Sequence, residues 1–332
     1  MVKPGVAIVG CGLIGQKRAL ALGEAKLVSC VDIDVARAHS IAALTPGCRA
    51  ESDWQEAVSC DDVHMVVAAA THNALPGITA AAINAGCHVL VEKPAACHAE
   101  DLYPLIQMAR EKQVQVRVGF NHRYHRAFQK ARKIIDAGDL GRLMFLRGRY
   151  GHGGRLGYEK EWRAQPTLSG GGELIDQGVH LIDLARWFLG DFVEIEGFAH
   201  TYFWDMPVDD NAFLLLRTDG AQTAFLHASC TEWKNTFSFE IYGEHGKLQI
   251  DGIGGSYGTE RLTWYRMLPQ MGPPETTAWE YPMADNSWEI EMKEFLRDIE
   301  MQRKPDPGLE DAVATLDIVG KVYKNSGYDH CA

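Results

Sequence analysis

The sequence has no cysteine pair of the C-x-x-C type, although its 332 residues include 8 cysteines, at positions 11, 30, 48, 60, 87, 97, 230 and 331. Thiolate zinc sites and redox-active dithiols use that short spacing, so the sequence argues against both. Cys30 and Cys87 lie inside apolar segments. We therefore expect free thiols, mostly buried, in a reducing compartment.

Positive charge and long apolar runs are also scarce. The chain has 33 Lys and Arg against 44 Asp and Glu, a formal net charge of −11, and nucleic-acid binding is not expected because neutralising phosphates needs a basic surface. No apolar run is long enough to span a bilayer. The short one in residues 1–15 is followed by Lys17 and Arg18 rather than by a cleavage site, so we expect a cytoplasmic protein without a membrane partner.

The first third of the chain alternates short apolar runs with helical patterns. This alternation predicts a doubly wound α/β sheet, the Rossmann type, over residues 1–122. Continuous apolar runs are typical of parallel strands that are covered on both faces. Strands are expected at 6–10, 26–32, 63–70, 87–94 and 114–120, with helices from Leu13 and at 36–44, 74–86 and 99–112.

The rhythm changes in residues 123–332, which we assign to a second α/β domain. Long alternating segments there predict an open, mostly antiparallel sheet with helices on one face. The Gly/Pro-rich segment 251–284 shows no regular pattern. We expect helices at 124–138, 171–190, 287–302 and 309–326, and strands at 143–150, 193–203, 211–218, 221–232, 237–243 and 246–251.

A glycine-rich turn, Gly10-Cys11-Gly12-Leu13-Ile14-Gly15, follows the first strand and opens a helix. In this context G-x-G-x-x-G predicts dinucleotide binding: the glycines permit the tight turn, the approach of a pyrophosphate and close helix packing. Asp32 ends the second strand, where a carboxylate takes the ribose hydroxyls of NAD. Ile33 and Asp34 follow it, and a 2′-phosphate would face two carboxylates. We therefore predict NAD in preference to NADP.

Three further groups carry candidate chemistry. Thr71-His72-Asn73 and Glu92-Lys93-Pro94 follow the third and fourth strands, on the edge that the glycine turn shares. Asp176 and His180 are four residues apart in the helix predicted at 171–190, so they share one face. Each group also has a structural interpretation. Asp176 and His180 would then only satisfy each other's hydrogen bonds, Lys93 would be a surface charge at a strand end, and His72 would be a solvated loop residue.

The glycine turn, Glu92-Lys93-Pro94 and Asp176-x-x-x-His180 within GGELIDQGVHLIDLARWFLG together resemble the Gfo/Idh/MocA oxidoreductase family, which includes glucose–fructose oxidoreductase and inositol dehydrogenases. The resemblance covers residues 5–326. It implies a Rossmann domain, a second domain with an open sheet that forms homodimers or homotetramers in many members, and NAD(P)-dependent oxidation or reduction of a secondary carbinol.

By this resemblance Lys93, Asp176 and His180 are the catalytic residues. A histidine near neutral pKa is a natural base for a hydroxyl proton, and a lysine donates to the developing alkoxide. Trp162-Arg163 matches a pair that many members place near nicotinamide and substrate. The residues expected at the cofactor are Gly10, Gly12, Leu13, Ile14, Gly15, Asp32, Ile33, Thr71, His72, Asn73, Glu92, Lys93, Asn121, Trp162 and Arg163.

The substrate residues are expected to be Lys93, Arg123, Tyr124, His152, Arg163, Asp176, His180 and Trp233. Aromatic and cationic side chains suit a polyhydroxylated ligand and would tolerate an anionic one, such as a uronate or a nucleotide sugar. No metal is expected. The leading prediction is an NAD-dependent sugar or cyclitol dehydrogenase. The alternatives are an enzyme that oxidises its substrate transiently with a retained NAD, as in epimerisation, glycoside cleavage or sugar transhydrogenation, and a non-catalytic NAD sensor.

Overall fold

The computed structural model describes residues 3–328, which divide into two compact units. The first unit holds the chain up to Phe120 together with Trp288–Leu316, and the second holds Asn121–Ser287 together with the chain from Asp317. The sequence assigned everything after residue 122 to the second domain. The structure differs because Trp288–Leu316 returns to the first unit, where its apolar side chains join the core.

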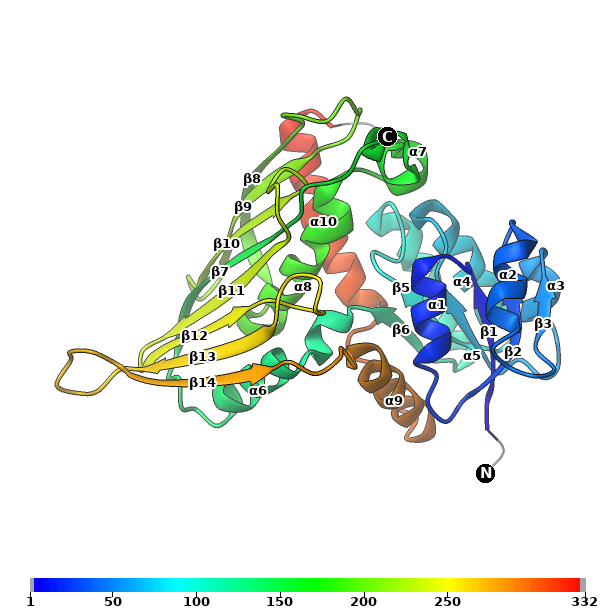
Figure 1. The fold of residues 1–332 in the computed structure, drawn as a ribbon, viewed down its shortest axis with the longest axis horizontal. Coiled ribbons are helices and arrows are strands. Elements are labelled where there is room, and N and C mark those ends of the chain that lie inside the picture. Colours follow the sequence, from blue (N-terminus) through cyan, green and yellow to red (C-terminus); the bar gives the residue numbers. More distant parts are fainter. Residues whose placement is uncertain (1–2, 329–332) are drawn as a thin grey trace. The chain divides into compact units, whose positions relative to one another are not determined.

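The first unit contains the predicted Rossmann sheet, with six parallel strands in the order β3-β2-β1-β4-β5-β6 (Figure 1). Its central strands are buried on both faces, as their continuous apolar runs predicted. The short elements β3, α3 and η1 were not predicted from the sequence. The elements are β1 (Gly5–Val9), α1 (Leu13–Leu20), β2 (Lys26–Val31), α2 (Val35–Ala42), β3 (Arg49–Glu51), α3 (Trp54–Val58), β4 (Met65–Ala68), η1 (His72–Ala74), α4 (Leu75–Asn84), β5 (His88–Glu92), η2 (Ala99–Leu102), α5 (Tyr103–Lys112), β6 (Val116–Gly119) and α9 (Ser287–Glu300).

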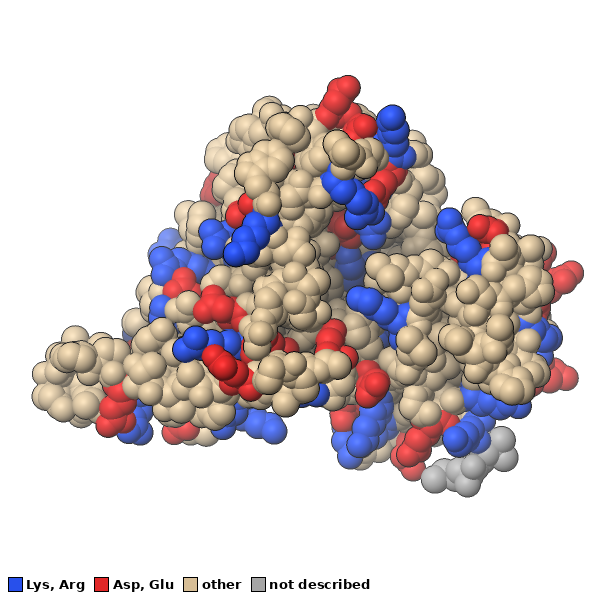
Figure 2. Space-filling view, in the orientation of Figure 1, with Lys and Arg blue, Asp and Glu red and all other residues tan. Residues whose placement is uncertain are grey.

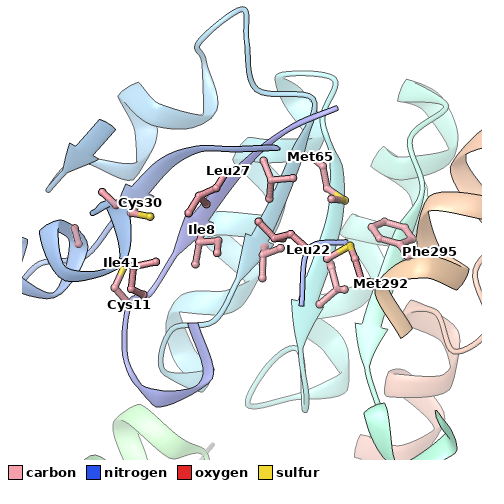
Figure 3. Packing of buried hydrophobic residues seen from close by; sticks show 14 residues of the cluster. Ile8, Cys11, Leu22, Leu27, Cys30, Ile41, Met65, Met292 and Phe295 are labelled. Carbon is pink, nitrogen blue, oxygen red and sulfur yellow. The ribbon is translucent and has the colours of Figure 1, made fainter. Parts of the chain in front are cut away.

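Helix α9 is part of the first unit's core although it lies some 170 residues beyond β6 in the sequence. Met292 and Phe295 are buried against the same cluster as Ile8, Leu22 and Met65 (Figure 3). Burying two such side chains stabilises the unit by roughly 3–6 kcal/mol. The first unit therefore depends on a segment from the C-terminal part of the chain.

The second unit contains an eight-stranded sheet in the order β14-β13-β12-β11-β7-β10-β9-β8. Only β10 pairs with β7 in parallel; the other pairs are antiparallel. Segment 251–284, expected to be irregular, forms β13 and β14. The elements are η3 (Asn121–Tyr124), α6 (Arg126–Asp136), β7 (Leu143–Gly151), η4 (Tyr158–Lys160), η5 (Trp162–Ala164), α7 (Pro166–Ser169), η6 (Leu174–Gly178), α8 (Val179–Leu189), β8 (Phe192–His200), β9 (Asn211–Thr218), β10 (Thr223–Ser229), β11 (Thr236–Gly243), β12 (Gly246–Asp251), β13 (Glu260–Arg266), β14 (Glu275–Tyr281) and the end of α10 (Leu309–Ser326).

Helices cover one face of this sheet, as the alternating pattern predicted. Helix α8 packs on β7 and β10, and α6 packs on β12, β13 and β14 (Figure 1). Leu214, Leu216 and Leu226 point to that side and are buried, while Leu215 and Phe225 point to the other side and are about half exposed. The alternation along the strands thus places an apolar stripe on the face that helices leave open.

Charged side chains of both signs are interspersed on the face drawn in Figure 2. Within residues 3–328, no helix is both long and apolar enough to cross a membrane. Seven cysteines fall within this range, and all are free thiols, with Cys48, Cys60 and Cys97 partly exposed and the other four buried. Cys331 lies outside the described residues.

Candidate active site

The glycine turn between β1 and α1 has the geometry of a dinucleotide cradle. A Cβ on Gly10, whose φ is +98°, would lie 2.3 Å from the carbonyl oxygen of Ala69, and one on Gly15 would lie 2.0 Å from that of Gly10. Around Gly12, in contrast, nothing lies within 4 Å of the position of a Cβ. Gly10 and Gly15 are therefore required by the protein's own packing, whereas Gly12 leaves space beside the backbone that suits a pyrophosphate.

Helix α1 begins at this open space. Because its N-cap residue is Gly12, no side chain caps its first N–H groups, which suits an anion at the helix N-terminus. The Asp32 carboxylate is fixed at the end of β2, where Oδ2 accepts from the Cys11 amide at 2.7 Å and Oδ1 accepts from the Asp34 amide at 2.9 Å. Residues 10–15 and Asp32 thus fit the phosphate and ribose parts of NAD. Leu13 and Ile33 are largely exposed beside them.

The strand ends after β4 and β5 carry the other candidates of the first unit. Thr71 donates to Asn73 Oδ1 at 2.8 Å across η1, and the His72 ring is buried rather than solvated. At the end of β5 the Glu92 carboxylate is buried and accepts from Arg18 Nε at 2.6 Å. Lys93 follows it directly and is partly exposed. Glu92 therefore contacts α1, and its contact with the cofactor stays a prediction.

The motif that carries Asp176 and His180 is not the continuous α-helix that the sequence predicted. Residues Leu174–Gly178 (η6) form a π-helical turn, and α8 begins at Val179. Asp176 lies in the wide turn and His180 in the first turn of α8, and both are about 95% buried. Single π-helical turns are frequent at functional sites, because the wider turn changes the direction of the side chains that precede it.

Buried Asp209 anchors the start of this motif. Its carboxylate accepts from the amides of Gly172 and Leu174, both at 2.8 Å, and from the Tyr323 hydroxyl at 2.7 Å. A Cβ on Gly172 would lie 1.9 Å from the Asp209 carbonyl oxygen. Burial raises the pKa of Asp209 to about 6, against three hydrogen bonds that lower it. Asp209 was not among the residues predicted from the sequence, although two adjacent acids, Asp209 and Asp210, directly precede an apolar strand there.

Aromatic rings surround His180 in the second unit. His122 stacks on it with ring centroids 3.8 Å apart, and Tyr150 lies 6.3 Å away. Tyr257 packs edge-on against Tyr150 at 5.0 Å. Burial, together with the negative charges of Glu173 and Asp176, raises the pKa of Tyr257 to about 12, so its hydroxyl remains protonated at neutral pH. Tyr257 was missed because segment 251–284 shows no pattern in sequence.

Arg163 and Asp176, both candidates from the sequence, form an ion pair. Arg163 Nε donates to Asp176 Oδ2 at 2.9 Å, and the guanidinium lies over the Trp162 ring at 4.6 Å. The charge of Asp176 is the main cause of a raised Arg163 pKa. The pair fixes the orientation of Asp176, and the structure brings the Trp162-Arg163 pair together with Asp176, which the sequence selected from a different motif.

A second pair joins His152 to Glu173, a buried acid that the sequence analysis did not select. His152 Nε2 lies 3.3 Å from Glu173 Oε1, and the Gly154 amide donates to His152 Nδ1 at 2.9 Å. Burial alone would lower the pKa of His152, but the hydrogen bond and charge of Glu173 outweigh it and raise the pKa. Tyr158 contacts the His152 ring edge-on. Glu173 lies three residues before Asp176 in the same motif, and this position was the signal available in the sequence.

Other candidates of the second unit have structural partners of their own. Arg123 donates to both oxygens of Asp183, at 2.9 and 2.6 Å, in a buried pair, and Tyr124 beside it is buried. Asn121 donates to the Ser287 hydroxyl at 3.0 Å. Trp233 is 65% exposed and packs against Phe203.

No group of three or more His, Cys, Asp or Glu side chains in residues 3–328 has the arrangement of a metal site.

Comparison with known proteins agrees with both units. Residues 5–120 match the family model described as "Oxidoreductase family, NAD-binding Rossmann fold", and residues 128–249 match the "GFO/IDH/MocA C-terminal domain". A levoglucosan dehydrogenase of Pseudarthrobacter phenanthrenivorans is 25% identical over 73% of this chain and 72% of its own length. Inositol 2-dehydrogenase 2 of Saccharopolyspora erythraea is 29% identical over 64% of this chain and 63% of its own length.

Among solved structures, an NAD binding oxidoreductase from Klebsiella pneumoniae superposes with a TM-score of 0.86, covering 98% of both chains at 23% identity. This likeness confirms the fold. Taken with the two domain matches, it shows that the chain belongs to the GFO/IDH/MocA family of oxidoreductases.

Proposed function

We propose that the protein is an NAD-dependent dehydrogenase that oxidises a secondary hydroxyl of a neutral polyhydroxylated molecule, a sugar or a cyclitol. The observation that carries the proposal is the presence of Lys93, Asp176 and His180 in a chain whose glycine turn leaves space for a pyrophosphate beside Gly12. The relatives named above act on levoglucosan and on inositol, which are both neutral polyols.

In this proposal each residue has one role. His180 accepts the hydroxyl proton, Lys93 donates a hydrogen bond to the oxygen on which negative charge develops, and Asp176, oriented by Arg163, binds a neighbouring hydroxyl. NAD, bound through residues 10–15 and Asp32, supplies the hydride acceptor. The stacked His122 limits the rotation of the His180 ring.

The charge pairing of the second unit supports a neutral substrate. The candidate cations Arg123 and Arg163 are paired with Asp183 and Asp176, and the candidate His152 is paired with Glu173. An anionic substrate would compete with these carboxylates, whereas a hydroxyl can donate to the acid and accept from the base of one pair. This argument ranks neutral polyols above the uronates and nucleotide sugars that the sequence left open.

We propose NAD rather than NADP because Asp32 is held in place by two amide hydrogen bonds and Asp34 caps α2 beside it. A 2′-phosphate at this position would meet two carboxylates.

The test mixes purified protein and NAD with candidate substrates and measures the absorbance of reduced nicotinamide. The neutral candidates are inositols and anhydrosugars, and the acidic candidates are uronates and nucleotide sugars. We expect reduction with one neutral class. Turnover with the acidic members alone would contradict the substrate proposal. Absence of reduction, with nicotinamide released only when the protein is denatured, would favour the enzyme with a retained cofactor.

A further inference from the structure

A buried arginine joins two carboxylates from distant parts of the first unit. Arg18 on α1 is fully buried; its Nη1 donates to Glu291 Oε2 on α9 at 2.5 Å, and its Nε donates to Glu92 Oε1 at the end of β5 at 2.6 Å. The Trp288 ring lies over the guanidinium at 4.5 Å. A guanidinium can hold two acceptors in fixed directions, which a lysine cannot. Arg18 therefore links α9 to the end of β5.

The end of β5 is also the start of the turn that presents Lys93. The Ala95 amide donates to the Glu92 carbonyl oxygen at 2.9 Å, so Lys93 and Pro94 are the two central residues of the turn. Glu92 is the first residue of this turn, and its side chain is held by the hydrogen bond from Arg18.

Gly119 on the neighbouring strand shows how tightly the Glu92 side chain is packed. It pairs with Glu92 in the sheet, and a Cβ at this position would lie 2.7 Å from Arg18 Nη2 and 3.0 Å from Glu92 Oε2. The space above Gly119 is thus occupied by the Arg18–Glu92 contact, and a side chain at residue 119 would displace it.

We propose that Glu291 and Arg18 are positioning residues of the reaction, which act on Lys93 through Glu92. The inference rests on the function proposed above, in which Lys93 touches the substrate. It assigns to α9 the task of fixing the Lys93 turn, in addition to its place in the core.

The charges of the cluster explain why Glu291 is needed there rather than an apolar residue. Burial, foremost, raises the pKa of Glu291, although the charges of Arg18 and Arg117 lower it. A buried carboxylate is costly unless it is paired and hydrogen-bonded. An apolar residue would stabilise α9 packing at least as well, but it could not hold Arg18 in the direction of Glu92.

Helix α9 offers a matched control. Asp298 lies seven residues after Glu291, is also buried, and pairs with Arg117 on β6. Its loss removes an equivalent ion pair from α9, but the partners of Arg117 are Asp298 and the Asp306 carbonyl oxygen rather than Glu92. Comparing the two positions separates the positioning of Lys93 from the general docking of α9.

The experiment compares Glu291→Ala, Glu291→Gln and Asp298→Ala in the full-length protein. We expect Glu291→Ala to lower kcat about tenfold with little change in KM for NAD, because a displacement of about 1 Å at a catalytic group costs up to ~100-fold. Glu291→Gln should restore most of the rate, since its amide oxygen still accepts from Arg18. Asp298→Ala should lower Tm but leave kcat close to that of the native protein.

A second readout does not depend on turnover. Lysines are ¹³C-dimethylated, the Lys93 signal is assigned by its loss in Lys93→Arg, and its chemical shift and titration are followed by NMR. Glu291→Ala and Arg18→Lys should both change the Lys93 signal, and Asp298→Ala should not. An unchanged Lys93 signal in both variants, or an equal change in Asp298→Ala, would overturn the inference. A changed signal in a protein that oxidises no polyol would instead refute the proposed function alone.

Discussion

Gly12 and Gly15 belong to one turn, but the structure requires them for different reasons, and this difference predicts two different mutant phenotypes. A methyl group at residue 15 would lie 2.0 Å from the Gly10 carbonyl oxygen, whereas one at residue 12 meets nothing in the protein. We expect Gly15→Ala to lower Tm by several degrees. Gly12→Ala should leave Tm unchanged and weaken NAD binding at least tenfold, because its methyl group occupies the space of the pyrophosphate.

The measurements are thermal unfolding without ligand and a fluorescence titration with NADH. Equal losses of stability in the two variants would show that Gly12, too, is required by packing. Native affinity in a folded Gly12→Ala protein would place the pyrophosphate elsewhere.

His180 is expected to be required for proton removal and dispensable for cofactor binding. Replacing it with Ala should lower kcat by roughly 10²–10⁴-fold, and added imidazole should restore part of the rate by serving as an external base. His227 is a suitable control because it is also stacked, on the Phe213 ring at 4.3 Å, yet belongs to no candidate site. If His227→Ala lowered kcat equally, or if His180→Ala lost its fold, the catalytic role of His180 would not stand.

For single residues, the sequence predicted which residues belong to the candidate sites better than it predicted which residues they contact. Asp32, Lys93, Arg163, Asp176 and His180 were selected from motifs, and the structure joins two of them directly in the Arg163–Asp176 pair. Glu92 and Arg123 were selected equally, yet their contacts are Arg18 and Asp183, which lie 74 and 60 residues away. Local patterns carry no information on such long-range pairs. The roles of these residues in catalysis and binding stay predictions.

At the level of elements, the π-helical turn η6 depends on the buried carboxylate of Asp209, and this dependence should be visible in the pH dependence of stability. The pKa of Asp209 is raised from an ordinary 3.8 to about 6 by burial, so between these values the folded protein holds a proton that the unfolded chain releases. The resulting stabilisation is complete below pH 4 and is lost as pH rises through about 6, by about 3 kcal/mol in total.

Asp209→Asn removes this titration. It also removes one of the two carboxylate oxygens, so the amide of either Gly172 or Leu174 loses its acceptor. We therefore expect the native protein to exceed the variant in Tm by the largest margin near pH 4, and by a smaller margin at pH 7. Thermal unfolding of both proteins across this range measures the difference directly. A margin that is constant, or that grows with pH, would show that Asp209 is not protonated at pH 4–6 in the folded protein.

Elements with strong periodicity were predicted well, and those shaped by tertiary contacts were not. The buried strands β1, β4 and β5 and the alternating strands β9 to β12 follow directly from their patterns. Strands β13 and β14 were missed because Gly, Pro and polar residues surround them, and β14 is mostly exposed. The π-helical turn η6 was missed because its cause, the contact of Gly172 and Leu174 with Asp209, lies 35 residues further along the chain.

For the molecule as a whole, the open face of the second unit's sheet is the feature that a single chain leaves unexplained. Leu215 and Phe225 are direct partners across β9 and β10, and they are 52% and 47% exposed. Helices α6 and α8 lie on the other face of this sheet (Figure 1). Phe198 on β8 extends the apolar stripe. Exposed apolar patches of this kind on a sheet mark association surfaces.

We therefore propose a homo-oligomer that forms through this face, as the family resemblance implied, and predict that Leu215→Glu with Phe225→Glu dissociates it. Each subunit would then bury two carboxylates against its partner, and the cost of desolvating these charges outweighs the apolar area gained. Sedimentation velocity over a range of concentrations should show a dimer or tetramer for the native protein and a monomer for the double variant. Leu20→Glu, at an exposed leucine of α1, is the control and should leave the assembly intact. A native protein that sediments as a monomer, or a double variant that still associates, would show that this face is not the interface.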